Sequence, residues 1–369
     1  MLLLIKIVVF VLFYLVVQRF IPPHYFLLKE SLGDYGLSGP LSFLGSHDGA
    51  HYLSIAKNGY NTYEQAFFPL FPIIINILGR ISMENYFPMV IILNIICALL
   101  SINQLKILTG HLYPHQKLNA TIFWWIVFPT SFFFFVIYNE SIFFLFSLIF
   151  LNSIYSKKHK TALLFGFLAA STRLVGVFLI IPALFQFIQE KKITKSLLIS
   201  FSGPILGLIT YMIYLFQKTG NPIFFFSAQP SFGANRSTHI ILLPQVIFRY
   251  LKIFFTANHD FVYFVAIMEM IALIVGLFCL WKCYQFFTKM DSSPKKNFLL
   301  LIIIFSSISY LLPTLTGTLS SLPRYLLTTP LTYWGLALID SKKQFILLLI
   351  SLMAQFVLFS LFSSGYFLS

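Results

Sequence analysis

A short polar stretch near the N-terminus holds the side chains best suited to chemistry. His47, Asp48, His51 and Tyr52 are close in sequence, and Glu64 follows them. An aspartate at the start of a helix can cap backbone N–H groups, which is one interpretation of Asp48. The histidine, aspartate and histidine together could instead bind a divalent metal ion. A third interpretation is a catalytic carboxylate that accepts a proton from a substrate.

The neighbouring residues predict how this stretch is held. Tyr52, Ile55 and Ala56 recur at the spacing of one helical face, so we expect a short amphipathic helix lying on a membrane surface. The apolar run over 73–78 is short for a membrane span and follows two prolines. It predicts a half-embedded helix on the outer side.

The composition indicates a membrane protein. Of the 369 residues, 58% are hydrophobic and 10% are charged, and the mean hydropathy is +0.86. A soluble globular protein carries about 25% charged residues, so a soluble protein is excluded. The expected fold class is all-α, a polytopic transmembrane helical bundle that forms one domain over 1–369.

The positions of the lysines predict the topology. Most lie in short loops between apolar runs, which the positive-inside rule places in the cytoplasm together with Lys6. An uncleaved first helix then leads to an external stretch, 22–66, and most acidic residues share that outer face. The polar site is therefore expected to open outward. The expected spans are 7–21, 88–108, 120–137, 141–155, 197–216, 261–287, 298–315, 325–339 and 344–363, with 161–189 as a hairpin or broken helix.

The formal net charge of +14 would suggest nucleic-acid binding in a soluble protein. Here the topology accounts for the lysines. The chain has no arginine-rich arm and no basic face interleaved with aromatic residues. No nucleic-acid partner is expected.

Motifs over most of the chain resemble those of one enzyme family. They are His47-Asp48, Ile55-Ala56, Gly59-Tyr60, Glu64, Ala66-Phe67-Phe68-Pro69-Leu70-Phe71-Pro72, Tyr138-Asn139-Glu140-Ser141, Thr172-Arg173-Leu174-Val175-Gly176, Gly220-Asn221-Pro222 with Ala228-Gln229, and Leu322-Pro323-Arg324-Tyr325. In content and order this set is similar to the signature of the GPI mannosyltransferase II (PIG-V) family and its bacterial relatives. His47 departs from the eukaryotic pattern, which has a tryptophan at that position.

The resemblance implies a glycosyltransferase of the GT-C type, a multi-helix membrane fold that takes a sugar from a polyprenyl phosphate. An acidic residue in the first external loop of that fold is essential, and Asp48 occupies the matching position. It would take the acceptor's hydroxyl proton as the anomeric carbon becomes oxocarbenium-like. The leaving phosphate needs cationic stabilisation, for which Arg173 and Arg324 are expected because guanidinium binds phosphate bidentately.

Further residues of these motifs, or beside them, are expected to bind substrate. The full expected set is His47, His51, Tyr52, Glu64, Glu140, Arg173, Gln229 and Arg324. Structural alternatives stay open for the charged members. Arg173 could form an ion pair with Glu140 or Glu269, and Arg324 could extend to the membrane interface. Glu64 could be a loop charge and Glu140 a solvated turn residue. No metal and no other cofactor is expected, because the resembled group is generally regarded as metal-independent.

The function expected from these features is inverting transfer of mannose from a polyprenyl-phosphate-linked donor. The acceptor would be a glycan or glycolipid on the external face, within the membrane lipids. Two alternatives remain, a lipid-linked sugar flippase or other transporter and an enzyme resembling an O-antigen ligase or polymerase. A transporter should show repeat symmetry, and no repeat is evident. The short loops and the lysine-, isoleucine- and phenylalanine-rich composition favour a bacterial plasma membrane.

Overall fold

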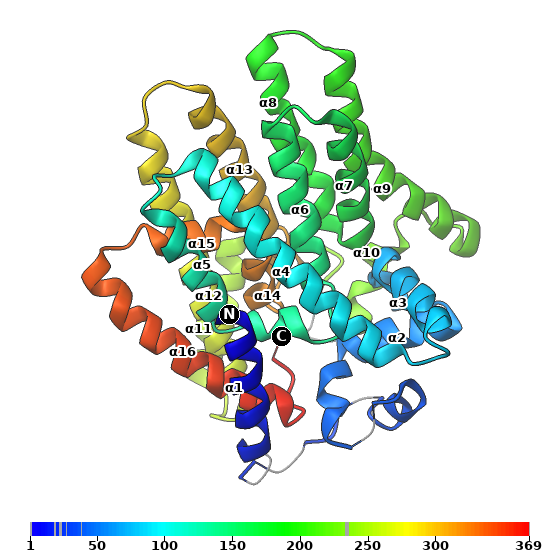
Figure 1. Ribbon diagram of the computed structural model, residues 1–369. Coiled ribbons are helices and arrows are strands. Elements are labelled where there is room, and N and C mark those ends of the chain that lie inside the picture. The colour runs from blue at the N-terminus through cyan, green and yellow to red at the C-terminus, as the bar shows by residue number, and fades with distance from the viewer. Residues whose placement is uncertain are drawn as a thin grey trace.

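The computed structural model describes residues 2–17, 20–21, 24–26, 28–37, 39–232 and 236–368, and this part of the chain contains helices and no strand. Short 3₁₀ turns join many of the helices. The α-helices (Figure 1) are α1 (Leu2–Val17), α2 (Asp48–Asn58), α3 (Leu70–Ile81), α4 (Tyr86–Leu112), α5 (Lys117–Val127), α6 (Glu140–Tyr155), α7 (His159–Thr172), α8 (Ile180–Glu190), α9 (Lys195–Thr219), α10 (Phe224–Ser227), α11 (Leu243–Thr256), α12 (Phe261–Thr288), α13 (Pro294–Leu311), α14 (Leu322–Leu327), α15 (Pro330–Ala337) and α16 (Ser341–Ser363).

Five helical segments of the described chain are long and apolar enough to cross a membrane. They are α4, α9, α12, α13 with the turn that follows it, and α16. They confirm the predicted spans 88–108, 197–216, 261–287, 298–315 and 344–363. The fold class is therefore confirmed as an all-α, polytopic helical bundle. A helix is present as α2 where the short amphipathic helix was predicted, and the predicted short helix after the two prolines is α3. Most residues of α2 are buried within the protein.

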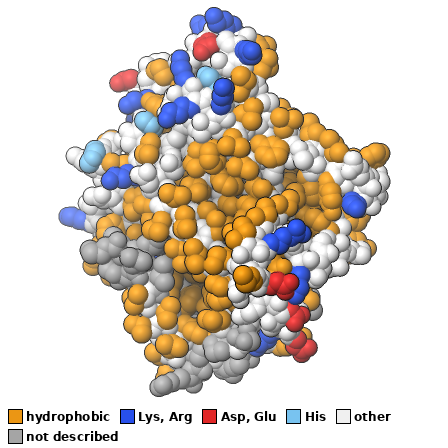
Figure 2. All heavy atoms as spheres, turned by 45° about the vertical axis from the view of Figure 1, so that its right-hand side comes forward, with side chains coloured by type: hydrophobic (Ala, Val, Ile, Leu, Met, Phe, Trp, Pro, Cys, Tyr) orange, Lys and Arg blue, Asp and Glu red, His pale blue; other side chains and the backbone are white. Residues whose placement is uncertain are grey.

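The outer surface of the bundle is suited to lipid. Apolar side chains such as Ile96 of α4, Ile213 of α9 and Ile274 of α12 are exposed. Figure 2 shows a broad hydrophobic surface with lysines and arginines gathered at its upper end. The loop between α8 and α9, whose sequence includes Lys191 and Lys192, lies at the top of Figure 1.

Side-chain caps fix where several long helices begin. The Thr194 hydroxyl accepts a hydrogen bond from the Leu197 N–H at the start of α9, and the Asp260 carboxylate accepts one from the Tyr263 N–H at the start of α12. These bonds satisfy N–H groups that have no partner within the helix. At its other end, α9 stops at Gly220, whose φ of 73° is in the left-handed region that favours glycine.

Small residues let α7 and α9 pack closely. A Cβ atom added to Gly203 would lie 2.2 Å from the Leu163 carbonyl oxygen, and one added to Gly207 would lie 2.5 Å from the Phe167 oxygen. The two glycines are four residues apart on α9 and face the backbone of α7. This is the close approach that small residues at i and i+4 permit between membrane helices.

Two of the predicted spans are wrong because the helix breaks inside them. Residues 120–137 divide into α5, an irregular segment with Pro129, and a 3₁₀ turn over Ser131–Phe135. Residues 325–339 divide at Pro330 into the short helices α14 and α15. Proline lacks an N–H and clashes with the preceding turn, so a helix ends before it. The predicted break within 161–189 is confirmed at Arg173, between α7 and a 3₁₀ turn, Leu174–Leu179.

The end of α5 is capped by side chains from both α1 and α16. Lys6 donates to the Ile126 carbonyl at 2.6 Å, Ser351 to the Val127 carbonyl at 2.7 Å and Gln355 to the Phe128 carbonyl at 2.7 Å. A carbonyl left without a partner in an apolar interior costs several kcal/mol. The expectation that Lys6 lies at the cytoplasmic surface is therefore wrong. Its side chain is buried against α5, where it binds a backbone carbonyl.

We predict that Gln355→Leu lowers the free energy of unfolding by about 1 to 3 kcal/mol, because buried acceptors lose their donor. The measurement is the thermal unfolding midpoint of the purified protein in detergent. Gln217→Leu is the matched control, because Gln217 is exposed on α9. Equal midpoints for the two variants would show that the capping bond contributes nothing.

Candidate functional site

Asp48 is the first residue of α2 and lies beside a buried turn. The Ile137 N–H donates to the Leu44 carbonyl at 2.8 Å, and the Tyr138 hydroxyl donates to the Ser46 carbonyl at 3.2 Å. A Cβ atom added to Gly49 would lie 3.1 Å from the Ile137 oxygen, so the start of α2 packs directly on this backbone. The segment that leads into α2 is thereby held against the residues that precede α6.

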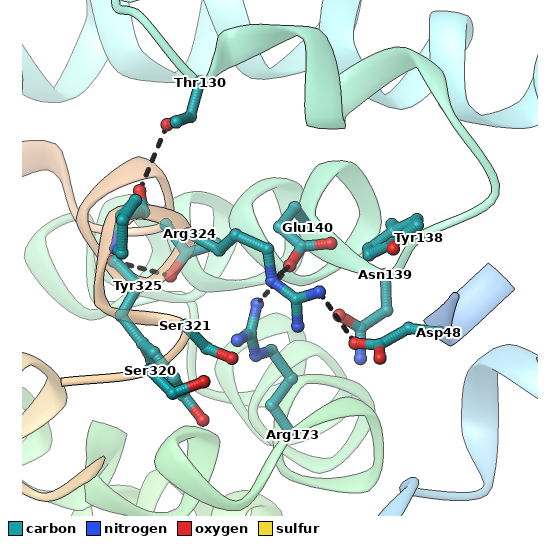
Figure 3. Close-up of polar contacts among 12 residues, drawn as sticks. Asp48, Thr130, Tyr138, Asn139, Glu140, Arg173, Ser320, Ser321, Arg324 and Tyr325 are labelled. Carbon is teal, nitrogen blue, oxygen red and sulfur yellow. Dashed lines mark hydrogen bonds and ion pairs between the residues drawn. The ribbon is translucent and has the colours of Figure 1, made fainter. Parts of the chain in front are cut away.

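A chain of ion pairs joins Asp48 to three distant charged residues (Figure 3). Arg324 donates from a terminal nitrogen to Asp48 Oδ2 at 2.7 Å, and its Nε lies 3.3 Å from Glu140 Oε1. Arg173 donates to the same Glu140 oxygen at 3.2 Å. Four residues from four separate segments, Asp48, Glu140, Arg173 and Arg324, therefore form one network.

This network is buried, which decides between several earlier interpretations. Glu140 is 0% exposed, and Arg173 and Arg324 are each 8% exposed. Glu140 is therefore not a solvated turn residue, and Arg324 does not extend to the interface. Arg173 pairs with Glu140 as one alternative proposed, whereas Glu269 accepts a hydrogen bond from the Tyr250 hydroxyl.

The cap interpretation of Asp48 is wrong. The residue in the cap position is His47, which makes no side-chain capping bond, and the Asp48 carboxylate binds Arg324 instead. His47 has φ 53° and ψ −116°, a backbone conformation in which glycine is favoured. This sharp turn aims the Asp48 side chain toward the guanidinium groups.

Broken helices and buried hydrogen bonds position the charged side chains. Glu140 begins α6, where a carboxylate is stabilised by the positive end of the helix dipole. Asn94 of α4 donates to the Tyr138 carbonyl and accepts from the Ser141 hydroxyl, which fixes the turn before α6. The Thr130 hydroxyl donates to the Pro323 carbonyl at 3.1 Å and so connects the break after α5 to the start of α14.

Aromatic rings support the two arginines of the network. The Arg173 guanidinium lies 4.6 Å from the centre of the Tyr325 ring, and that of Arg324 lies 4.9 Å from the centre of the Tyr138 ring. Both contacts are within the range of cation–π attraction. The rings replace part of the hydration that the guanidinium groups lose on burial.

A cavity of about 310 Å³ opens beside the network. Of the residues predicted from the sequence, its lining includes Asp48, Tyr52, Arg173, Gln229 and Arg324. Four others are absent from that lining, His47, His51, Glu64 and Glu140. The cavity therefore brings together the predicted acid and both predicted arginines, and the excluded residues lie around it.

His51 and Glu64 form a pair that supports α2. His51 Nδ1 lies 3.0 Å from Glu64 Oε1, and the Asn61 N–H donates to Glu64 Oε2 at 2.9 Å. Glu64 is buried, so it is not a solvated loop charge. Within the described residues, no three side chains of metal-binding type gather in one place. The pair connects α2 to the segment 64–69, which leads into α3.

Electrostatics keep Asp48 ionised. Burial raises the pKa of its carboxyl, but the charge and hydrogen bond of Arg324, with smaller contributions from His51 and Arg236, outweigh burial and lower the pKa below its ordinary value. The Tyr52 hydroxyl in the same cavity has its pKa raised by burial. At neutral pH the cavity thus presents a carboxylate acceptor and a protonated tyrosine hydroxyl.

His47 lies among aromatic side chains outside the cavity. Its ring centre is 5.4 Å from that of Phe26 and 5.1 Å from that of Phe367. Burial lowers the pKa of the imidazole to about 4. His47 therefore remains neutral at pH 7 and packs as an aromatic ring against Phe26 and Phe367.

Sequence reasoning missed several polar residues that line the cavity, among them Arg236, Ser320 and Ser321. Arg236 donates to Gln229 Oε1 at 2.9 Å and to the Ser321 hydroxyl at 3.1 Å. Gln229 and Arg236 are only seven residues apart, so the spacing was a usable signal. No role was predicted for Arg236 from the sequence.

Comparison with known proteins gives structural likeness without sequence relatives. No protein-family model matches the chain, and no curated protein matches it. Three structures of the Archaeoglobus fulgidus oligosaccharyltransferase align with the chain at 12% sequence identity. The complex with Zn and sulfate has a TM-score of 0.49, and the alignment covers 97% of this chain and 53% of that one. The form tethered to an acceptor peptide with the NVT sequon has a TM-score of 0.45 and coverages of 98% and 55%, and the apo form has a TM-score of 0.47 and coverages of 98% and 56%. The chain thus spans about half the length of that enzyme.

We predict that Glu140→Gln lowers the free energy of unfolding by about 3 to 5 kcal/mol, because it leaves two buried guanidinium groups without their shared carboxylate. Thermal unfolding in detergent measures the change. Glu84→Gln is the matched control, because Glu84 is exposed. A Glu140→Gln midpoint equal to that of the control would mean that the network does not stabilise the fold.

A second prediction concerns His47 and pH. In the unfolded chain the His47 imidazole has a pKa of about 6.5, whereas in the folded protein burial lowers its pKa to about 4. Between these values the unfolded state binds more protons, so stability falls as the pH falls, by up to about 3 kcal/mol. We expect His47→Phe to reduce the slope of unfolding midpoint against pH in this window. An unchanged slope would contradict the burial of a neutral imidazole.

Proposed function

We propose that the protein is a membrane glycosyltransferase of the GT-C type that transfers mannose, with inversion, from a polyprenyl-phosphate-linked donor to a glycan or glycolipid acceptor. The observation that carries this proposal is the ionised Asp48 carboxylate in a cavity lined by three guanidinium groups. A carboxylate suits an acceptor hydroxyl, and guanidinium groups suit a phosphate. The order of motifs in the sequence supports the same reaction.

In the proposed reaction Asp48 acts as the base. Arg324 binds Oδ2 and holds the carboxylate in one orientation, so that Oδ1 accepts the proton of the acceptor hydroxyl. The hydroxyl oxygen forms a bond to the anomeric carbon from the face opposite the phosphate. The bond between that carbon and the phosphate oxygen breaks, and the lipid phosphate leaves with the electron pair.

The low pKa of Asp48 is compatible with this role. The acceptor hydroxyl becomes acidic only as its oxygen bonds to the oxocarbenium-like carbon, so proton transfer comes late and a carboxylate suffices. Glu140 takes no part in the chemistry, because it does not line the cavity. It is a positioning residue that holds Arg173 and Arg324 through its carboxylate.

The proposed setting is the outer face of a bacterial plasma membrane. The lysine-rich loops mark the opposite end of the bundle, and the stretch that carries Asp48 follows the first helix. The donor's lipid chain would lie between the helices, with its phosphate in the cavity.

We predict that Asp48→Asn lowers the rate of transfer at least about 100-fold, because the amide cannot accept the proton. The assay follows radiolabelled mannose from polyprenyl-phosphate-mannose into membrane lipid extract, with purified protein and with and without EDTA. Asp34→Asn is the matched control, because Asp34 is exposed in the same external stretch.

Each outcome of this assay has a defined meaning. Transfer that depends on Asp48 and resists EDTA would support the proposed metal-independent enzyme. Transfer that survives in Asp48→Asn would contradict the role of base. If neither the wild type nor any variant transfers mannose, the proposed function would be contradicted. Transfer that EDTA abolishes would contradict the expectation that the reaction needs no metal.

A further inference from the structure

The charges of the cavity do not cancel. Asp48 and Glu140 supply two carboxylates to the cavity and its network, whereas Arg173, Arg236 and Arg324 supply three guanidinium groups. The carboxylates pair with Arg173 and Arg324 at 2.7 to 3.3 Å. One positive charge is therefore left over.

The remaining charge belongs to Arg236. Its partners are neutral, since its guanidinium donates to Gln229 Oε1 at 2.9 Å and to the hydroxyls of Ser321 at 3.1 Å and Ser320 at 3.5 Å. None of the ion pairs among the residues that the structure describes includes Arg236. A half-buried guanidinium that hydrogen-bonds only neutral groups, and whose charge acts on Asp48 without an ion-pair contact, is ready to bind an anion.

The loop before α14 holds Ser320 and Ser321 in place. The Leu319 N–H donates to the Tyr250 hydroxyl at 2.9 Å, and Arg249 donates to the Gly317 carbonyl at 3.2 Å. The serine hydroxyls that accept from Arg236 are therefore fixed by α11. They orient the guanidinium at the wall of the cavity that also contains Asp48.

From this arrangement we infer that Arg236 binds the phosphate of the donor, and that its single unpaired charge selects a lipid monophosphate sugar over a lipid diphosphate sugar. A sugar phosphodiester carries one negative charge, which Arg236 alone neutralises. A diphosphate brings a second charge, for which the cavity offers only guanidinium groups already paired with carboxylates. The inference rests on the proposed function and moves the phosphate contact away from Arg173 and Arg324, where the sequence placed it.

The test measures donor binding and transfer separately. A short-chain polyprenyl-phosphate-mannose, the corresponding polyprenyl-diphosphate-mannose and a phosphate-free polyprenyl mannoside are titrated against the purified full chain in detergent. We expect the wild type to bind the monophosphate most tightly. Arg236→Gln should weaken that binding about 10- to 100-fold and bring it close to that of the phosphate-free mannoside.

Two further variants make the result specific. Arg236→Lys keeps the charge but loses the planar fork, so it should retain a preference for the monophosphate over the phosphate-free mannoside with weaker binding. Arg80→Gln removes an exposed arginine that does not line the cavity and should bind as the wild type does. Unfolding midpoints show that each variant is folded.

The outcomes separate the inference from the proposed function. If the protein selects the monophosphate through Arg236 but catalyses no transfer, the result would support the inference and contradict the proposed glycosyltransferase activity. Transfer with unchanged donor binding and unchanged KM in Arg236→Gln would overturn the inference and leave the enzyme intact. Tighter binding of the diphosphate, or no binding of any donor, would also overturn the inference.

Discussion

The arrangement of the interior depends on the ion pairs that Arg324 forms with two carboxylates. Its guanidinium contacts the carboxylates of Asp48 and Glu140, which lie at the starts of α2 and α6. A charge buried among apolar helices must be paired, and removal of one partner costs far more than the pair contributes. The helices α2, α6 and α14 are therefore held in fixed positions relative to one another. The same contacts direct the Asp48 carboxylate into the cavity.

Interrupted helices make this geometry possible. A continuous membrane helix satisfies its own backbone and offers no end at which charged side chains can converge. Here α5 and α7 end, and α6 and α14 begin, inside the bundle, and Glu140, Arg173 and Arg324 lie at or near these helix ends. Irregular backbone at this depth is tolerated where protein groups bind its carbonyls, as Thr130 does for Pro323.

The sequence predicted the long spans and the short helix at Asp48 well, because hydropathy and helical spacing are local properties. It failed over 120–137 and 325–339, where apolar composition continues across a proline break. Lys6 was misplaced because its partners are carbonyls of α5, far away in the chain. Arg236 was missed for a related reason, since its charge matters only once Arg173 and Arg324 are known to be paired. The motif resemblance pointed to residues that converge, but their roles as base and binding groups stay predictions.

The capping of α5 bears on how the chain is assembled. Ser351 binds a carbonyl that lies 224 residues earlier in the sequence, and Gln355 binds its neighbour. During synthesis these carbonyl groups enter the membrane long before α16 exists. Native docking of α5 must therefore await α16, so this part of the interior becomes complete only after that helix has been synthesised. A nascent chain that stalls before α16 leaves the Val127 and Phe128 carbonyls without these donors, a feature by which a membrane chaperone or protease can distinguish it from the folded protein.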